Sequence, residues 1–186
     1  MRSSIAPIEA ELDALQRESF SYFEHEVNPA NGLVKDKTAA DWPASIAATG
    51  FALAAYPVGG ERGFISRAAA VQRTLTTLRF FMASRQGPER DATGYQGFYY
   101  HFLDMRTGHR AWDCELSTVD TAFLLAGMLT AAAYFELPNA DEHAIRTIAD
   151  ALYRRTNWQW TQNEGITITH GWKHRIRFPP VSLGGV

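Results

Sequence analysis

The stretch Ala44-Ser-Ile-Ala-Ala-Thr-Gly-Phe-Ala-Leu-Ala-Ala-Tyr56 carries apolar or small side chains on every side of a helix. A helix without a polar face is buried all round, whereas a surface helix keeps one solvated face. Pro43 stands where a helix takes its first residue, and Pro57 is expected to end it, because proline removes a backbone donor. The segment 118–135 has the same character. The sequence therefore predicts two interior helices.

Three other segments have the spacing of amphipathic helices. The first covers 8–27 and is expected to end before Pro29. Ser66 is expected to cap the second, and Asn139, followed by Glu142 three residues later, resembles a capping box that opens the third. The residues expected to face inward are Ile8, Leu12, Leu15, Phe20, Phe23 and Val27, then Val71, Leu75, Leu78 and Met82, then Ile145, Ile148, Leu152 and Tyr153. Arg67, Arg73, Arg79 and Arg85 mark the solvated side of the second helix.

Amphipathic and wholly apolar helices alternate along the chain without exception. In a four-helix bundle every helix would be amphipathic, because each one faces water on its outside. A toroid of helical hairpins instead places one helix of each pair in an inner ring and the other outside. The alternation therefore predicts an all-α protein, a partial α/α toroid.

The long connections are expected on one rim of this toroid. They cover 28–42, 86–117 and the chain from 157 onward, whereas the connections on the other rim are short. The aromatic stretch 97–103, followed by a turn at 105–108, predicts a short β-hairpin before the second inner helix. Long loops on a rigid scaffold commonly carry function.

Composition and charge exclude several classes of function. The 186 residues are 46% apolar, and 18 basic residues against 20 acidic ones give a net charge of -2. This balance predicts no nucleic-acid partner and no membrane surface. The single cysteine, Cys114, makes no internal disulfide, and no Cys or His clusters have metal-finger spacing, so we expect no structural zinc site. The first ten residues contain no apolar signal core, which predicts a cytoplasmic protein as written, with a periplasmic or secreted location as the alternative for a full-length relative.

All five tryptophans fall in the long connections. They are Trp42, Trp112, Trp158, Trp160 and Trp172. Such rings stack on the apolar faces of sugars while their N–H groups meet hydroxyls. The alternative is that they close the open end of the toroid as core material. We interpret the five together as a carbohydrate-binding rim.

Carboxylates accompany the tryptophans on this rim. Glu115 and Asp120 flank the start of the second apolar helix. Beside aromatic loops, desolvation is expected to raise the proton affinity of Glu115, which suits a general acid. Asp120 lies in the first helical turn, which favours its ionised form as a base or substrate anchor. The alternative is that Glu115 and Asp120 only cap the helix.

Further residues of the same connections are expected to bind substrate. The predicted catalytic pair is Glu115 and Asp120, and the predicted substrate-binding residues are Trp42, Asp41, Tyr100, His101, Trp112, Asp113 and Trp172. Tyr100, Trp42 and Trp112 are the expected sugar platforms. His101 is flanked by aromatic residues, and its alternative role is that of a core residue with its hydrogen bonds satisfied.

Four ordered blocks carry a family resemblance, which covers roughly residues 8–173. They are Ala47-Ala-Thr-Gly-Phe-Ala-Leu53, Gly60-Glu-Arg-Gly-Phe-Ile-Ser-Arg67, Gly94-Tyr-Gln-Gly-Phe-Tyr-Tyr-His-Phe-Leu-Asp-Met-Arg-Thr-Gly-His-Arg110 and Glu115-Leu-Ser-Thr-Val-Asp-Thr-Ala122. The chain resembles the glycoamylase-like family of bacterial (α/α)6 toroids, which includes endo-β-1,2-glucanases and a domain of cyclic β-1,2-glucan synthases. The resemblance implies a glucan substrate, an acidic site that maps onto Glu115 and Asp120, and no cofactor.

The sequence departs from this family toward its end. Two complete hairpins and one further outer helix are present, whereas six hairpins close the family's ring. We expect residues 1–173 to be the N-terminal portion of a toroid and 174–186 to be an irregular tail. Exposed inner helices would then favour self-association.

Three functions remain open at this point. The first is a glycoside hydrolase that uses carboxylate acid/base catalysis on β-1,2-glucan or a related oligosaccharide. The second is a non-catalytic helical module that binds a glycan or a protein. The third is a lyase on the same type of toroid.

Overall fold

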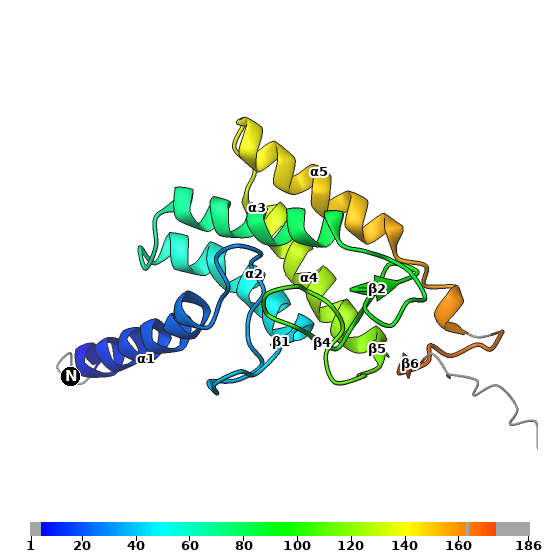
Figure 1. The fold of residues 1–186 in the computed structure, drawn as a ribbon. Coiled ribbons are helices and arrows are strands. Elements are labelled where there is room, and N and C mark those ends of the chain that lie inside the picture. The colour runs from blue at the N-terminus through cyan, green and yellow to red at the C-terminus, as the bar shows by residue number, and fades with distance from the viewer. Residues whose placement is uncertain (1–4, 163, 174–186) are drawn as a thin grey trace, which may run out of the picture.

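The computed structural model describes residues 5–162 and 164–173, with side chains from Ile8 onward. Its helices are α1 (Ile5–His25), α2 (Ile46–Glu61), α3 (Arg67–Ala83), α4 (Thr118–Tyr134) and α5 (Ala140–Arg155), with a 3₁₀ helix η1 (Trp160–Gln162) (Figure 1). Its short strands are β1 (Ala44–Ser45), β2 (Gly94–Tyr95), β3 (Phe98–Tyr100), β4 (Phe102–Leu103), β5 (Leu116–Ser117) and β6 (Gly171–Trp172). The irregular tail expected over 174–186 lies outside the described residues.

The helices form two layers. The inner helices α2 and α4 pack against each other, α3 lies against α2, α5 lies against α4, and the outer helices α3 and α5 contact each other (Figure 1). Fully buried residues of the inner pair include Leu53, Tyr56, Leu124 and Met128. The expected all-α architecture with alternating inner and outer helices is confirmed.

Two glycines let the inner helices touch backbone to backbone. A Cβ atom at Gly50 would lie 2.5 Å from the carbonyl oxygen of Phe123 and 2.7 Å from Cα of Leu124. A Cβ atom at Gly127 would overlap the backbone of Gly50. Because the obstructing atoms belong to the backbone, no rotamer change could make room for a side chain. The tight α2–α4 contact therefore requires glycine at both positions.

Side-chain caps start the helices α2 to α5. Ser45, Ser66, Ser117 and Asn139 each accept a hydrogen bond from the backbone N–H three residues later. Each cap pairs a donor that the helix itself leaves without an acceptor. The predicted caps Ser66 and Asn139 are confirmed.

The expected limits of the first inner helix are wrong at both ends. Strand β1 precedes α2, so Ser45 rather than Pro43 stands at its start, and α2 continues through Pro57 to Glu61. Tyr56, Pro57 and Gly59 are all buried. The packing of this last part of the helix outweighs the one backbone hydrogen bond that a proline removes.

The strands gather at the end of the molecule where α2 and α4 begin (Figure 1). Strand β1 pairs with β4, and a second sheet has the order β2-β3-β5-β6. A short hairpin in the connection before α4 is confirmed as β2–β3, but it turns at 96–97. At the predicted turn, 105–108, only an isolated bridge between Leu103 and Arg110 closes the loop, and the aromatic stretch 97–103 divides between β3 and β4. The short connections 62–66 and 135–139 lie at the other ends of the inner helices. The long connections therefore share one rim, as predicted.

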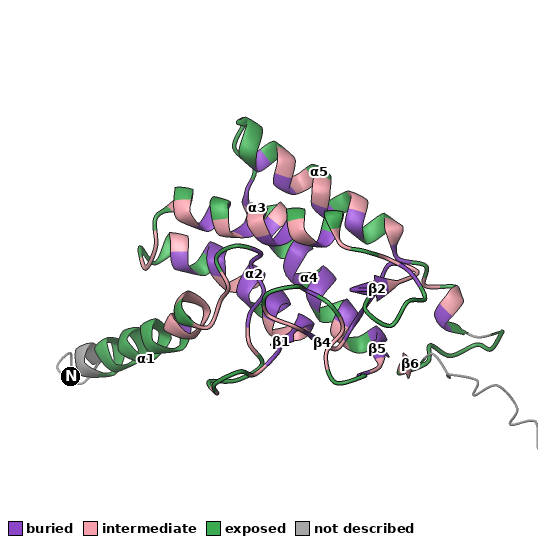
Figure 2. Ribbon diagram, viewed as in Figure 1, coloured by how far each residue is buried: buried purple, intermediate pink, exposed green. Residues whose placement is uncertain are grey.

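The first helix packs less than its sequence predicts. Ile8, Leu12 and Leu15 are 56%, 59% and 59% exposed, and only Phe20 of the expected inward stripe is buried. Figure 2 shows the first part of α1 as exposed. The apolar stripe is present, but the described part of the chain does not cover its first half.

Each inner helix also keeps an exposed apolar edge. Phe51 and Val58 on α2, and Phe123 and Leu129 on α4, are 40–52% exposed. The rings of Phe51 and Phe123 lie 5.5 Å apart, so the two edges meet. The prediction that the inner helices are buried on every side is therefore correct for only part of each helix. Among the residues described, none of the helices combines the length and the apolar character needed to cross a membrane.

A buried ion pair joins the two outer helices. The carboxylate of Glu142, which is 2% exposed, accepts hydrogen bonds from Nε and Nη2 of Arg67, both at 2.9 Å, and from the backbone N–H of Leu137 at 2.8 Å. The prediction that Arg67 belongs to the solvated side of α3 is wrong, because its guanidinium reaches α5. These charge-assisted bonds fix the α3–α5 contact.

The stability of the fold is expected to depend on the ionisation of Glu142. The hydrogen bond from Arg67 outweighs the opposing effect of burial and lowers the pKa of Glu142 below its ordinary value of 4.5. A depressed folded-state pKa contributes stability above the unfolded pKa and loses it as the pH falls through the folded pKa. Thermal unfolding between pH 7 and 3 should therefore show a steeper acid loss in the unmodified protein than in Glu142→Gln. Parallel pH profiles for the two proteins would contradict this assignment.

Candidate functional site

Aromatic rings from two connections meet on the rim that carries the strands. The ring centroids of Trp42 and Trp112 lie 4.8 Å apart in an edge-on arrangement, and Phe102 lies 5.2 Å from Trp112. Pairing of Ser45 with Phe102 between β1 and β4 brings these connections together. Three aromatic rings therefore form one continuous surface.

A cavity of about 690 Å³ opens beside Trp42 and Trp112. Its lining residues are Lys35, Asp41, Trp42, Pro43, Asp104, Met105, Arg106, Arg110, Ala111 and Trp112. This volume lies within the range of small-molecule sites. Trp112 is 58% exposed, whereas the ring of Trp42 carries the Lys37 ammonium 3.6 Å from its centroid. Trp112 is thus the more accessible of the two predicted platforms.

His101 connects this aromatic surface to the two predicted catalytic carboxylates. Its ring stacks on Phe102 with centroids 4.0 Å apart, and its Nδ1 lies 2.9 Å from Oε1 of Glu115 and 3.6 Å from Oδ2 of Asp120. The backbone N–H of His101 donates to the carbonyl of Glu115 at 3.0 Å. The structure therefore brings Trp42, Trp112, His101, Glu115 and Asp120 into one connected group.

The expected raised proton affinity of Glu115 is wrong. Burial does raise the pKa of this carboxyl, but the hydrogen bond from His101, a backbone N–H and the charge of Lys173 together hold the pKa below its ordinary value. Glu115 is only partly buried, so desolvation does not prevail. At neutral pH the side chain is an ionised acceptor.

Asp120 takes part in the capping of α4. Its Oδ2 accepts a hydrogen bond from the Ser117 hydroxyl at 2.6 Å, and its backbone N–H donates to the same hydroxyl at 3.1 Å. The capping role considered from the sequence is therefore present. It does not exclude a role toward substrate, because the same carboxylate oxygen faces His101.

Asp41, Trp112 and Asp113 adopt left-handed backbone conformations, with φ of 54°, 55° and 54°. Such conformations are uncommon outside glycine and cluster at ligand-binding sites. Asp113 forms an ion pair with Arg110 at 3.0 Å and lines a second cavity of about 370 Å³ with Arg90 and Trp112. The predicted residues Asp41 and Asp113 therefore both lie at the mouth of the site.

The structure argues against Tyr100 as a sugar platform. Tyr100 is fully buried, and the guanidinium of Arg110 lies 4.4 Å from the centroid of its ring. A sugar cannot stack on a ring without a free face. Tyr100 ends the short strand β3, whose three residues are all buried, and aromatic content alone did not reveal this burial.

Trp172 lies on the other side of Glu115. Pairing between β5 and β6 places Trp172 opposite Leu116, and a Cβ atom at Gly171 would lie 3.2 Å from Cγ of Glu115. The ring of Trp172 stacks on Tyr95, with centroids 5.4 Å apart. Trp158 and Trp160 pack around Phe98 in the same cluster and are partly buried. The five tryptophans thus form two groups with Glu115 between them.

Sequence reasoning missed two residues of this site. Phe102 joins Trp112 to His101, and Arg110 lines both cavities while it donates to the carbonyl of Cys114. Two features of the sequence could have pointed to Arg110. It is the last residue of the block 94–110 that carries the family resemblance, and it precedes Trp112 by two residues. Within the described ranges, no group of three or more potential metal ligands is placed to hold an ion.

The comparisons with known proteins agree on one group of enzymes. No family model matches the chain. A relative from Parabacteroides distasonis, named exo β-1,2-glucooligosaccharide sophorohydrolase (non-reducing end), is 33% identical over 156 residues. That match covers 80% of this chain and 20% of the relative.

Solved structures show the same likeness in three dimensions. A β-1,2-glucanase from Parabacteroides distasonis matches with a TM-score of 0.78 and 29% identity, over 87% of this chain and 23% of that one. A glucoamylase-like protein from Bacteroides uniformis matches with a TM-score of 0.75 and 29% identity, over 88% of this chain and 40% of that one. The expected resemblance to glycoamylase-like proteins is confirmed. The chain spans 20–40% of the length of these relatives.

Proposed function

We propose that this chain carries the sugar-binding mouth and two of the functional carboxylates of a glycoside hydrolase that acts on β-1,2-linked glucan. The observation that supports it is the continuous series from the Trp42–Trp112 pair through Phe102 and His101 to Glu115 and Asp120. Stacking surfaces beside paired carboxylates are what glycoside hydrolysis requires. The relatives named for β-1,2-glucan give the proposed linkage.

We assign different tasks to the parts of this site. The exposed Trp112 ring stacks on a sugar unit at the mouth, and Asp41 and Asp113 accept hydrogen bonds from its hydroxyls. Glu115, held ionised by His101, acts as a base or stabilises positive charge at the reacting carbon, and is no longer proposed as the proton donor. Asp120 anchors the same region through its contact with His101.

Removal of the Trp112 ring is expected to weaken glucan binding about tenfold, because the stacking surface is lost. Stability should change little, since the ring is 58% exposed. The measurement is calorimetric titration of a β-1,2-glucooligosaccharide into Trp112→Ala and Trp112→Phe. The phenylalanine variant keeps a stacking face and should bind within about threefold of the unmodified chain. Equal affinities for the alanine variant and the unmodified chain would remove Trp112 from the site.

A second candidate function is glycan binding without hydrolysis. It is favoured by the lowered pKa of Glu115, because the residue that the sequence suggested as the proton donor is ionised. The two candidates differ in turnover. Saturable binding of β-1,2-glucooligosaccharide without release of reducing ends would support the binding module, whereas release that depends on Glu115 would support the hydrolase.

A further inference from the structure

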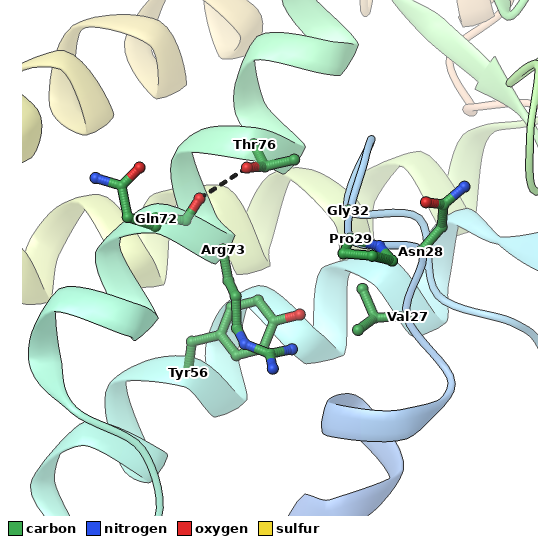
Figure 3. A pocket seen from close by; sticks show the side chains of 8 residues that line it. All are labelled: Val27, Asn28, Pro29, Gly32, Tyr56, Gln72, Arg73 and Thr76. Carbon is green, nitrogen blue, oxygen red and sulfur yellow. Dashed lines mark hydrogen bonds between the residues drawn. The ribbon is translucent and has the colours of Figure 1, made fainter.

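A smaller cavity lies between α2, α3 and the connection that follows α1. Its volume is about 210 Å³, and none of its lining residues belongs to the proposed glucan site. The residues that line it are Val27, Asn28, Pro29 and Gly32 from the connection, Tyr56 from α2, and Gln72, Arg73 and Thr76 from α3 (Figure 3).

The Tyr56 hydroxyl is fully buried and has no acceptor for its proton among the described residues, and the guanidinium of Arg73 is the charged group beside it. Figure 3 shows this hydroxyl directed toward Val27 and the connection, beside the guanidinium of Arg73. Buried hydroxyls are nearly always paired. Arginine is a donor only, so Arg73 cannot accept the phenolic proton. The hydroxyl therefore presents a donor to the cavity that no described group accepts.

Arg73 brings a positive charge to the same cavity. Its guanidinium lies 5.9 Å from the centroid of the Tyr56 ring, and one of its N–H groups donates to the carbonyl of Phe23 at 3.4 Å. No ion pair joins Arg73 to a carboxylate in the described part of the chain. Two acidic residues at the end of α1 and in its connection have other partners, since Glu24 pairs with Arg17 at 3.7 Å and Glu26 pairs with Lys35 at 2.9 Å.

The other polar side chains of the cavity are already engaged. Asn28 donates to the carbonyl of Met105 and accepts from the N–H of Ala30. Gln72 donates to Asp141, and Thr76 donates to the carbonyl of Gln72. The side-chain donors of the cavity that lack an acceptor are the Tyr56 hydroxyl and N–H groups of Arg73. The amide oxygen of Gln72 keeps its capacity to accept, but Figure 3 shows this amide directed away from the Tyr56 hydroxyl.

We propose that this cavity binds a small carboxylate. One carboxylate would accept the Tyr56 proton and hydrogen bonds from Arg73, which satisfies both groups with one ligand. Val27 and Pro29 offer an apolar wall for a short aliphatic tail. The volume equals that of roughly seven water molecules at about 30 Å³ each, which limits the ligand to a short acid.

The test is thermal unfolding of the full chain in sodium butyrate, compared with sodium chloride at equal ionic strength. Binding to the folded state raises Tm, and the rise should reach roughly 2–4 °C when butyrate is about five times its Kd. Tyr56→Phe removes only the hydroxyl, so it should lose most of this rise while its Tm in chloride stays equal or increases. Arg73→Gln should lose the rise as well.

A neutral control distinguishes the contribution of the aliphatic tail of butyrate from that of its carboxylate. Butan-1-ol has the same tail without the carboxylate and should give no rise. The proposal is overturned if butyrate gives no rise beyond chloride, if butanol gives the same rise, or if Tyr56→Phe responds like the unmodified chain. Because Tyr56→Phe is isosteric apart from one oxygen, misfolding would be visible as a lowered Tm in chloride. In that case direct titration of butyrate into Arg73→Lys decides, since lysine keeps the charge but not the planar fork and should bind at least about threefold more weakly.

Discussion

Replacement of Glu115 by glutamine is expected to slow the release of reducing ends from β-1,2-glucan by at least about a hundredfold. Glutamine keeps the size of the side chain but cannot hold the negative charge that His101 stabilises at 2.9 Å. The reaction would therefore lose either a base or the charge that stabilises an oxocarbenium-like transition state. Binding should change much less, so the loss should appear in the turnover rate.

A matched control separates this effect from a general change of charge. Glu136 is an exposed glutamate between α4 and α5, at the end opposite the strands. Glu136→Gln changes net charge by the same amount and should leave the rate within about twofold. If Glu115→Gln retains the full rate of the unmodified chain, Glu115 has no part in the chemistry.

Replacement of Arg67 by methionine is expected to lower the free energy of unfolding by about 3 kcal/mol. Methionine preserves the length of the side chain but leaves the Glu142 carboxylate, which is 2% exposed, without its charged partner. This loss of stability should lie at the lower end of the range seen when buried ion pairs are broken, because the Arg67 side chain is itself 34% exposed. Urea unfolding followed by circular dichroism measures the change.

An exposed ion pair on α5, the helix that carries Glu142, provides the comparison. Arg154 and Asp150 on α5 lie 2.8 Å apart, with side chains that are 75% and 57% exposed. Arg154→Met should lower the free energy of unfolding far less than Arg67→Met does, because water already solvates both charges of the exposed pair. Equal losses in Arg67→Met and Arg154→Met would show that burial of Glu142 contributes nothing.

The helix order was predictable because burial leaves a clear pattern in the sequence. The apolar segments 44–56 and 118–135 became α2 and α4, and the capping residues Ser66 and Asn139 marked α3 and α5. Ends and faces were less predictable. Helix α2 continues through Pro57 because the residues around it are buried. The first half of the apolar stripe of α1 is exposed because no described residue covers it, and the spacing of apolar residues does not say which elements pack against a helix.

The candidate site was predictable as a region rather than in its details. Long connections on one rim placed Trp42, Trp112 and Glu115 together, because loop length and helix direction fix which ends share a rim. The protonation state of Glu115 was missed, since it depends on the contact with His101 across two strands. The burial of Tyr100 was missed because all three residues of β3 are buried, so the strand shows no alternation of buried and exposed positions.

The central claim is that the indoles and the carboxylates form one glucan-binding mouth. Its most direct test is a titration of a β-1,2-glucooligosaccharide followed through the five indole N–H signals in the NMR spectrum. The account predicts saturable shifts for Trp42 and Trp112 with a single Kd, which Trp112→Ala weakens. Unchanged signals from both Trp42 and Trp112 at saturating sugar would contradict it.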